Sequence, residues 1–202
     1  MHRFYIYSNL RGFVPKPIIK DPKNTSVIIA GGFGPIDSGI TWAKMEEMRK
    51  TFNTIFWVPG MIEFSNFKYF GNFDQTNEFI KLGQTHMGVS SIIPINNNVI
   101  TFKGIKMVGS PCFTAAVNPH FAAEDTEFIK SEATADALVI AATHVPVLRG
   151  RWVIHGTPPT GENFTIMNDV QMHISNSREA VGFNENYFLD INCSSFVPRD
   201  ME

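Results

Sequence analysis

Residues 54–64 read TIFWVPGMIEF, and this stretch decides the fold prediction. A run of β-branched, apolar and aromatic residues is typical of a strand buried on both faces, and Pro59-Gly60 predicts a tight turn directly after it. In α/β folds the carboxyl end of such a strand usually presents the functional groups. Here the turn leads into Met61 and Ile62, side chains that neither hold a metal well nor move a proton.

A second buried strand is predicted upstream, at residues 26–30 (SVIIA), where an apolar run ends at Gly31-Gly32. Between the two strands, residues 41–52 (TWAKMEEMRKTF) place apolar side chains at helical spacing with charges between them. This β-α-β order predicts two parallel strands joined by a crossover helix.

The remaining chain alternates between strand and helix patterns without a repeat or a visible domain boundary. Further strands are predicted at residues 3–8, 91–95, 98–102, 105–109, 137–142, 152–155, 164–167, 170–174 and 188–191, and further helices at 74–83 and 120–132. Asn-rich and Lys-Gly turns separate the strands between residues 91 and 109, which predicts antiparallel pairing. Together these patterns predict an α/β fold: a layered sandwich of two mixed β-sheets flanked by helices, in a single domain spanning 1–202.

The composition indicates a folded globular protein, with 44% hydrophobic and 18% charged residues. A formal net charge of −2 gives no general electrostatic reason to expect nucleic acid or an anionic membrane as partner. The longest apolar run, residues 137–142, is far shorter than the roughly 20 residues of a membrane helix. Cys112 and Cys193 are expected to be free thiols. We therefore expect a soluble intracellular protein, cytoplasmic or part of a virion.

Five of the predicted strands end in distinctive loops: SNLR (8–11), GGFG (31–34), PGMIE (59–63), THVP (143–146) and HGTPP (155–159). Their order and spacing resembles the calcineurin-like metallophosphoesterases, in particular the small bacterial and phage members. In that family the motifs Asp-x-His, Gly-Asp, Gly-Asn-His-Glu, Thr-His and Gly-His-x-His each follow a strand. Residues 104–114 and 175–183 also resemble the hairpin and the late turn of those members.

The resemblance implies a metal site at the strand ends that has degenerated in this chain. In the family two divalent cations, bridged by the Gly-Asp carboxylate, activate a hydroxide, and anionic and imidazole ligands offset the repulsion between the cations. At the matching positions His144 keeps the family residue, and Glu63 matches the last residue of the third motif. The other positions carry Asn9, Arg11, Gly32, Met61, Ile62, Thr157 and Pro159. We therefore expect no catalytic residues, no bound metal and no cofactor.

Two interpretations of Arg11 remain open. A guanidinium among backbone amides can hold a phosphorylated ligand without a metal. The cationic site for such a ligand would consist of Arg11, His144, Arg149 and Arg151. In the competing interpretation Arg11 forms an internal ion pair with Glu63 or Asp37, which neutralises a carboxylate left without a metal.

Residual catalysis is a further alternative, in which His144, Asn9 and one carboxylate hold a single metal for phosphoester hydrolysis. Other catalytic patterns are weaker, because the sequence has no Gly-x-Ser-x-Gly elbow and residues 31–34 lack the Lys-Ser/Thr of a phosphate loop. His155 is expected to have a packing role.

These residues predict a catalytically inactive protein that acts as a binding or structural component of an assembly. The resemblance to phage members implies that this assembly belongs to a phage or virus. We expect protein partners, and the alternative ligand is a phosphorylated small molecule. We expect no binding to nucleic acid or to a membrane. One aromatic-rich stretch either presents side chains to a partner or folds back over the site. Its members are Phe64, Phe67, Tyr69, Phe70 and Phe73.

Overall fold

The computed structural model describes residues 1–65, 78, 81, 85, 91–112, 119–143 and 149–193. In chain order its elements are β1 His2–Tyr7, the 3-10 helix η1 Pro22–Asn24, β2 Thr25–Ala30, α1 Gly39–Arg49, β3 Thr54–Val58, β4 Ile92–Pro94, β5 Asn98–Phe102, β6 Ile105–Ser110, α3 Pro119–Glu132, β7 Leu138–Ala141, β8 Trp152–His155, β9 Phe164–Met167, β10 Met172–Ser175 and β11 Phe188–Ile191.

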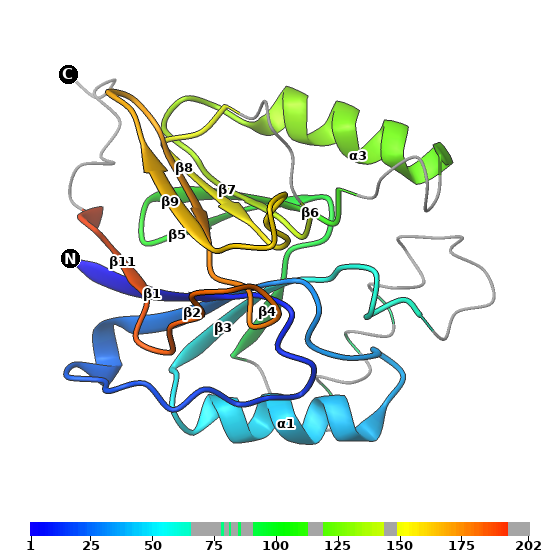
Figure 1. Ribbon diagram of the computed structural model, residues 1–202, viewed down its shortest axis with the longest axis vertical. Helices are drawn as coiled ribbons and strands as arrows, with labels where there is room; N and C mark the ends of the chain where they lie inside the picture. The colour runs from blue at the N-terminus through cyan, green and yellow to red at the C-terminus, as the bar shows by residue number, and fades with distance from the viewer. Residues whose placement is uncertain are drawn as a thin grey trace.

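The strands form two mixed sheets (Figure 1). The first has the order β11-β1-β2-β3-β4, in which β1 to β4 run parallel and β11 is antiparallel. The second has the order β5-β6-β7-β8-β10-β9, with a parallel centre and an antiparallel strand at each edge. The predicted α/β class with two mixed sheets is confirmed.

Three apolar clusters explain how these elements are layered. One cluster lies between the sheets, where the first sheet contributes Phe4, Ile28 and Phe56 and the second sheet contributes Met107, Ile140 and Ile154. On the outer face of the first sheet, helix α1 buries Trp42, Met45 and Met48 against strand residues such as Tyr5 and Trp57. On the outer face of the second, Ile129 of α3 packs with Val139 and Val153. Each helix therefore covers one outer face (Figure 1).

One pairing differs from the prediction. Strand β4 pairs parallel with β3, whereas β5 and β6 form the expected antiparallel hairpin in the other sheet. The chain passes from one sheet to the other between Pro94 and Asn98. The three short strands therefore belong to two sheets, and turn residues alone do not reveal such a switch.

A second difference concerns the start of β10, which begins at Met172 instead of residue 170. Asn168 Oδ1 accepts hydrogen bonds from the backbone N–H groups of Val170 and Gln171, at 3.0 and 2.7 Å. These side chain–backbone bonds hold the two residues in the turn that joins β9 to β10. Most of the predicted helix at 74–83 lies outside the described residues.

The parallel strands bring their carboxyl ends together, and backbone hydrogen bonds join the loops that follow them. Asn9 N–H donates to Gly31 O, Gly31 N–H to Val58 O, and Gly156 N–H to Ala141 O, all at 2.8–2.9 Å. Loops after β1, β2, β3, β7 and β8 thus meet at one end of the molecule, which is the candidate site.

Two further expectations concern cysteine chemistry and membranes. Cys112 and Cys193 are both free, as expected, and burial raises the pKa of the Cys112 thiol to about 12. Within the described ranges, none of the helices has the length and apolar content needed to span a bilayer.

Candidate functional site

Close-packed backbone forms the floor of the site, where the two sheets approach each other. A Cβ added at Gly31 would lie 2.9 Å from the Ala142 Cβ, and one at Gly60 would lie 3.2 Å from both that Cβ and the Gly31 Cα. A Cβ at Gly156 would lie 2.2 Å from the carbonyl oxygens of Ala142 and Ala30. Larger residues at these glycines would force the loops apart.

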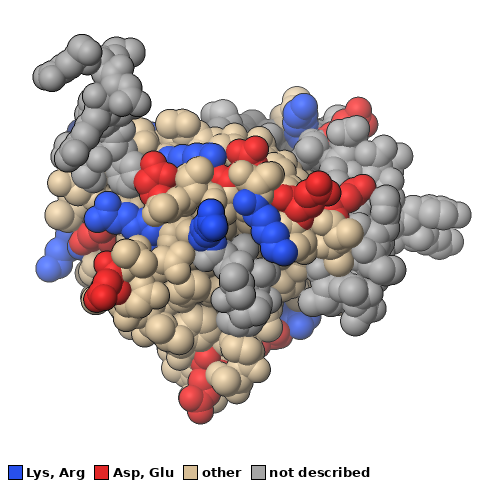
Figure 2. All heavy atoms as spheres, turned by 90° about the horizontal axis from the view of Figure 1, so that it is seen from above, with Lys and Arg blue, Asp and Glu red and all other residues tan. Residues whose placement is uncertain are grey.

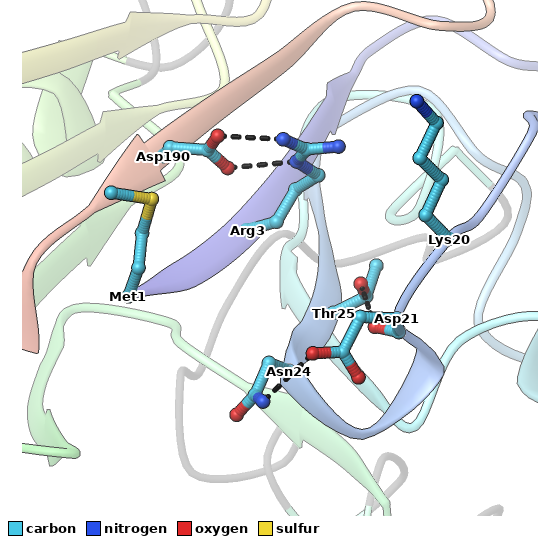
Figure 3. A pocket seen from close by; sticks show the side chains of 7 residues that line it. All are labelled: Met1, Arg3, Lys20, Asp21, Asn24, Thr25 and Asp190. Atoms are coloured by element: carbon cyan, nitrogen blue, oxygen red, sulfur yellow. Dashed lines mark hydrogen bonds and ion pairs between the residues drawn. The ribbon is translucent and has the colours of Figure 1, made fainter.

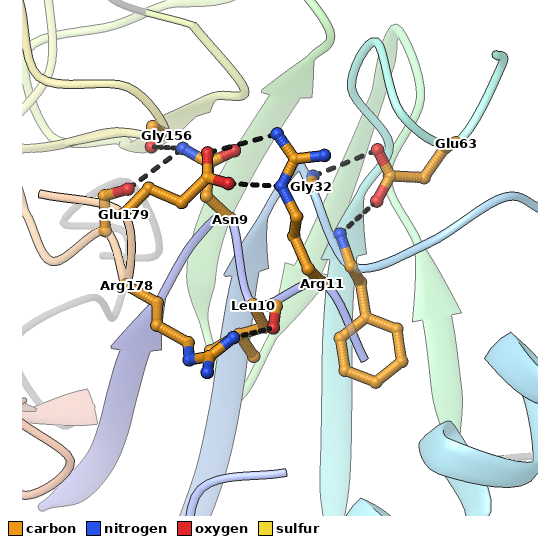
Figure 4. A network of polar contacts seen from close by, with 10 residues as sticks. Asn9, Leu10, Arg11, Gly32, Glu63, Gly156, Arg178 and Glu179 are labelled. Carbon is orange, nitrogen blue, oxygen red and sulfur yellow. Dashed lines mark hydrogen bonds and ion pairs between the residues drawn. The ribbon is translucent and has the colours of Figure 1, made fainter. Parts of the chain in front are cut away.

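Gly32 and Asn9 are also in direct contact. Gly32 has a φ of +72°, and a Cβ there would lie only 2.3 Å from Asn9 Oδ1 and 2.7 Å from Asn9 Cα. Asn9 Nδ2 donates hydrogen bonds to Gly156 O at 3.1 Å and to Ser177 Oγ at 2.9 Å (Figure 4). Asn9 therefore connects the loop after β1 with the loop after β8 and the segment after β10. The space at position 32 is too small for a side chain that could ligate an ion.

Glu63 fills the space between the loops that follow β2 and β3. Its side chain is fully buried. Oε2 accepts hydrogen bonds from the N–H groups of Gly32 at 3.0 Å and Gly60 at 2.8 Å. Oε1 accepts from those of Phe33 at 2.5 Å and Gly34 at 3.4 Å. Four backbone donors thus converge on one carboxylate of the chain itself, as Figure 4 shows for part of the set.

The protonation of Glu63 is subject to two opposing effects. Burial raises the pKa of its carboxyl group above the ordinary value, and the N–H donors of Gly32, Gly60 and Phe33 act in the opposite direction. With both oxygens engaged by these donors, Glu63 has little remaining capacity to ligate a metal.

Arg11 forms an ion pair, but with an acid that the sequence did not indicate. Its Nε and Nη2 donate to the carboxylate of Glu179, and both side chains are about half exposed (Figure 4). This pairing raises the pKa of Arg11. The expectation of a pair with Glu63 or Asp37 is wrong, because the Arg11 guanidinium pairs with Glu179, while backbone amides engage Glu63.

The segment that follows β10 supplies the partners that sequence reasoning missed. Ser177 accepts from Asn9 and Glu179 from Arg11, each across 168 positions of sequence. Arg178 Nη1 also donates to Leu10 O at 3.2 Å. The run SNSRE after a strand was the only local signal, and it does not reveal a contact with the first loop.

The remaining predicted site residues lie at the surface or outside the described ranges. Met61 is 48% exposed, Thr157 and Pro159 are exposed, and Ile62 is partly buried. Phe64 belongs to the core cluster under α1. The other members of that aromatic stretch lie outside the described residues: Phe67, Tyr69, Phe70 and Phe73. The predicted site residue His144 also lies outside them.

Arg149 and Arg151 do not extend a cationic patch at this site. Arg151 N–H donates to Ala137 O at 2.9 Å, next to the start of β7. Because β7 and β8 are parallel, the connection between them must return to their amino ends before β8 begins. Both arginines therefore lie at the opposite end of the sheet from Arg11, and this part of the prediction is wrong.

His155 is buried beside the site and contacts a second histidine. Its Nε2 lies 3.0 Å from His173 Nδ1, and the two rings stack with an interplanar angle of 11°. Burial lowers the pKa of His173. The buried ring of His155, stacked on His173, has the surroundings of a side chain with a packing role.

A two-metal centre does not fit this donor set. Asn9 and Glu63 are engaged by neighbouring loop atoms, and Gly32 has no side chain. Among the residues that the structure describes, no group of three or more His, Cys, Asp or Glu side chains is placed to hold a metal ion.

A separate hollow of about 230 Å³ lies at the other end of the first sheet (Figure 3). Arg3 in its wall is held by both oxygens of Asp190, at 2.7 and 2.6 Å, and Asp21 accepts from Asn24 Nδ2. Its side-chain charges are balanced, and the hollow is smaller than the roughly 300 Å³ at which ligand pockets begin. It therefore gives no indication of function.

No family model and no curated protein matches this chain. Among solved structures, it is similar to the crystal structure of phosphopantetheinyl hydrolase from Mycobacterium tuberculosis, with a TM-score of 0.57 and 11% sequence identity. The match covers 89% of this chain and 89% of that chain. At this identity the likeness shows the fold alone.

This finding corrects the family assignment made from the strand-end loops. Those loops resembled the motifs of the calcineurin-like metallophosphoesterases, but no family model matches the chain, and the likeness found is to the phosphopantetheinyl hydrolase structure. Glycines and prolines after buried strands occur in many α/β folds, so loops that keep only one of the family's metal-ligand residues, His144, are too weak a signal to assign a family. What is supported is an α/β fold of the kind seen in that hydrolase.

Proposed function

We propose that this chain is a hydrolase-fold protein without hydrolytic activity, which acts as a binding or structural component of an assembly. The observation that carries the proposal is Glu63, whose buried carboxylate accepts hydrogen bonds from four loop amides. Converging backbone N–H groups are the usual means by which a strand-end loop binds an anionic substrate or stabilises negative charge during a reaction. Here the carboxyl group of Glu63 occupies that position.

The same geometry argues against a site for a phosphorylated ligand. Such a ligand would need the amides that Glu63 engages and the guanidinium that Glu179 engages. The loop amides and the Arg11 guanidinium are therefore already engaged by carboxyl groups of the chain itself. A place in a phage or virus rested on the corrected resemblance and is not part of the proposal.

The competing function is hydrolysis, because the solved structure with a similar fold is described as a phosphopantetheinyl hydrolase. The test is to incubate the purified chain with bis(p-nitrophenyl) phosphate and with a phosphopantetheinyl ester, each with excess Mn²⁺. We expect no release of product above the rate without protein, because Glu63 and Glu179 occupy the groups that would bind the phosphate.

Two variants make this assay decisive. Asn9→Ala and Arg11→Ala change the site without altering a member of the three apolar clusters, and their melting temperatures show whether they are folded. Turnover by the wild-type chain that is lost in a folded variant of either kind would overturn the proposal. Equal background rates for all three proteins would support it.

A further inference from the structure

Another hollow, of about 180 Å³, lies where the chain enters β2 and β3. The polar members of its wall are Lys23, Arg49, Lys50, Thr51 and Asn53. Three of these residues are cations, and no acid lines the hollow, whereas Asp21 and Asp190 both line the hollow of Figure 3. The wall of this second hollow, which we call the basic hollow, therefore carries an excess of positive charge.

The fold brings these residues together from two segments that are distant in sequence. Because β2 and β3 are parallel neighbours, the segments that precede them lie side by side. One segment is η1, which carries Lys23. The other follows α1, where the N–H groups of Thr51 and Phe52 donate to Met48 O at 2.9 and 3.0 Å and turn the chain towards β3. The ammonium group of Lys23 thus shares a wall with the cations at the end of α1.

The protein itself compensates this positive charge only in part. Arg49 donates from Nε and Nη2 to the carboxylate of Glu46, at 2.9 and 2.8 Å, which leaves Nη1 available. Within the described part of the chain, no carboxylate forms an ion pair with Lys23 or Lys50. Nearby carboxylates act on these two lysines only from a greater distance.

The helix accounts for some of these cations but not for their convergence. Cations are favourable in the last turn of a helix, where the carbonyl groups carry partial negative charge, and Arg49 and Lys50 lie there. Lys23 comes from the other segment. Its presence in the same wall adds repulsion between like charges, which a bound anion would offset.

We propose that the basic hollow binds a phosphate group, either as free inorganic phosphate or as part of a small molecule. Lys23, Lys50 and the remaining Nη1 of Arg49 supply the positive charge, and the Thr51 hydroxyl and the Asn53 amide supply neutral donors. The volume of about 180 Å³ is small for a drug-sized ligand but sufficient for a single phosphate group.

The inference is independent of the proposed function. The basic hollow lies at the amino ends of β2 and β3, whereas the loops around Glu63 follow the carboxyl ends of the same strands. A chain whose strand-end loops exclude phosphate can therefore still bind it here. Because the three cations are exposed, we expect a Kd on the order of 1 mM at low ionic strength.

The first experiment titrates the isotope-labelled full chain with sodium phosphate and follows the backbone amide signals by NMR. We expect saturable shifts at Lys23, Thr51 and Asn53, with a Kd on the order of 1 mM. Shifts that do not saturate by about 20 mM phosphate would overturn the proposal, as would identical shifts with sodium chloride at the same ionic strength.

Charge-removing variants test whether the binding depends on this hollow. Lys23→Gln and Lys50→Gln each remove one exposed cation, and each should raise the Kd for phosphate at least about threefold. Lys130→Gln, the same charge change at an exposed position on α3, is the matched control and should leave the Kd unchanged. Equal effects of all three variants would show a response to net charge alone and would overturn the proposal.

A variant that keeps every charge separates a formed site from diffuse attraction. Thr51→Val combined with Asn53→Ala removes both neutral donors, and we expect the Kd to rise at least about twofold. An unchanged Kd would contradict a phosphate held inside the hollow.

The same titration with methyl phosphate distinguishes the two sources of the phosphate group. Similar Kd values for both compounds support recognition of the phosphate group alone. Tighter binding of inorganic phosphate supports the free ion as ligand, and tighter binding of the ester supports a phosphorylated small molecule. Failure of both compounds to bind would overturn the proposal.

Discussion

At the scale of single residues, Glu63 supplies the oxygen atoms that accept hydrogen bonds from the loop amides after β2 and β3. Its role was not visible in the sequence, where a glutamate after a strand-end turn is as well suited to catalysis as to structure. Four backbone donors identify it as a structural group. Gly32 and Asn9 could be placed at the site from their positions after strands, but their mutual contact could not, because it depends on side-chain packing between loops.

Replacing Glu63 is expected to destabilise the fold strongly. Glu63→Gln places an amide N–H₂ against backbone N–H donors, and we expect a loss of about 2–3 kcal/mol in the free energy of unfolding measured with urea. The same change at the exposed ion pair, Glu179→Gln, should lower it by less than about 0.5 kcal/mol. Similar values for the two variants would show that the hydrogen bonds to Glu63 contribute little.

Gly32 and Gly12 separate backbone strain from steric conflict. Both have a φ of about +73°, but a Cβ at Gly12 would have nothing within 4 Å, whereas one at Gly32 would lie 2.3 Å from Asn9 Oδ1. We expect Gly12→Ala to lower the free energy of unfolding by about 1 kcal/mol and Gly32→Ala by about 3 kcal/mol or more. Thermal or urea unfolding measures both. Equal effects would mean that Asn9 moves aside at little cost.

At the scale of elements, local patterns predicted the strands and most of their pairing, including the parallel pair β2–β3 and the hairpin β5–β6, but not the partner of β4. The strands at residues 54–58, 98–102, 152–155 and 188–191 were bounded correctly, because continuous apolar or alternating patterns and turn residues mark them locally. The parallel partner of β4 and the position of Arg151 depend on which sheet a strand joins and where a crossover returns. That information lies in contacts between distant segments.

His2, in strand β1, is expected to make the stability of the fold depend on pH. His2 is buried, its Nε2 lies 2.8 Å from Ser26 Oγ, and Lys103 Nζ lies 3.1 Å from its Nδ1. Burial, and then the charge of Lys103, lowers the pKa of His2 from 6.5 to about 4. Between these values the unfolded chain binds more protons than the folded one, so the stability contributed by neutral His2 is lost as the pH falls from 6.5 to 4.

The measurement is urea unfolding of the wild-type chain and His2→Phe across that pH range. Phe keeps an aromatic ring against Phe4 and Phe102 but does not titrate. The stability of the wild-type chain relative to this variant should decrease as the pH is lowered. A difference that is constant with pH, or that increases towards pH 4, would contradict the assignment of a neutral buried imidazole.

At the scale of the whole molecule, two sheets and two described helices form a fold similar to that of a hydrolase, at 11% sequence identity. A fold at this distance does not determine function, because function resides in the site. The face seen from above carries Lys and Arg side chains among Asp and Glu side chains (Figure 2). The class and layering followed from sequence patterns, whereas the family assignment did not, because loop motifs were short and their ligand residues mostly absent.

The central claim is that an internal carboxylate occupies the strand-end site, and a crystal structure grown with Mn²⁺ and inorganic phosphate tests it most directly. The account predicts that Glu63 stays bound to the amides of Gly32, Phe33 and Gly60, and that Arg11 stays paired with Glu179, with neither ion between the loops. A phosphate on those amides, or a Mn²⁺ ligated by Asn9 or Glu63, would contradict it.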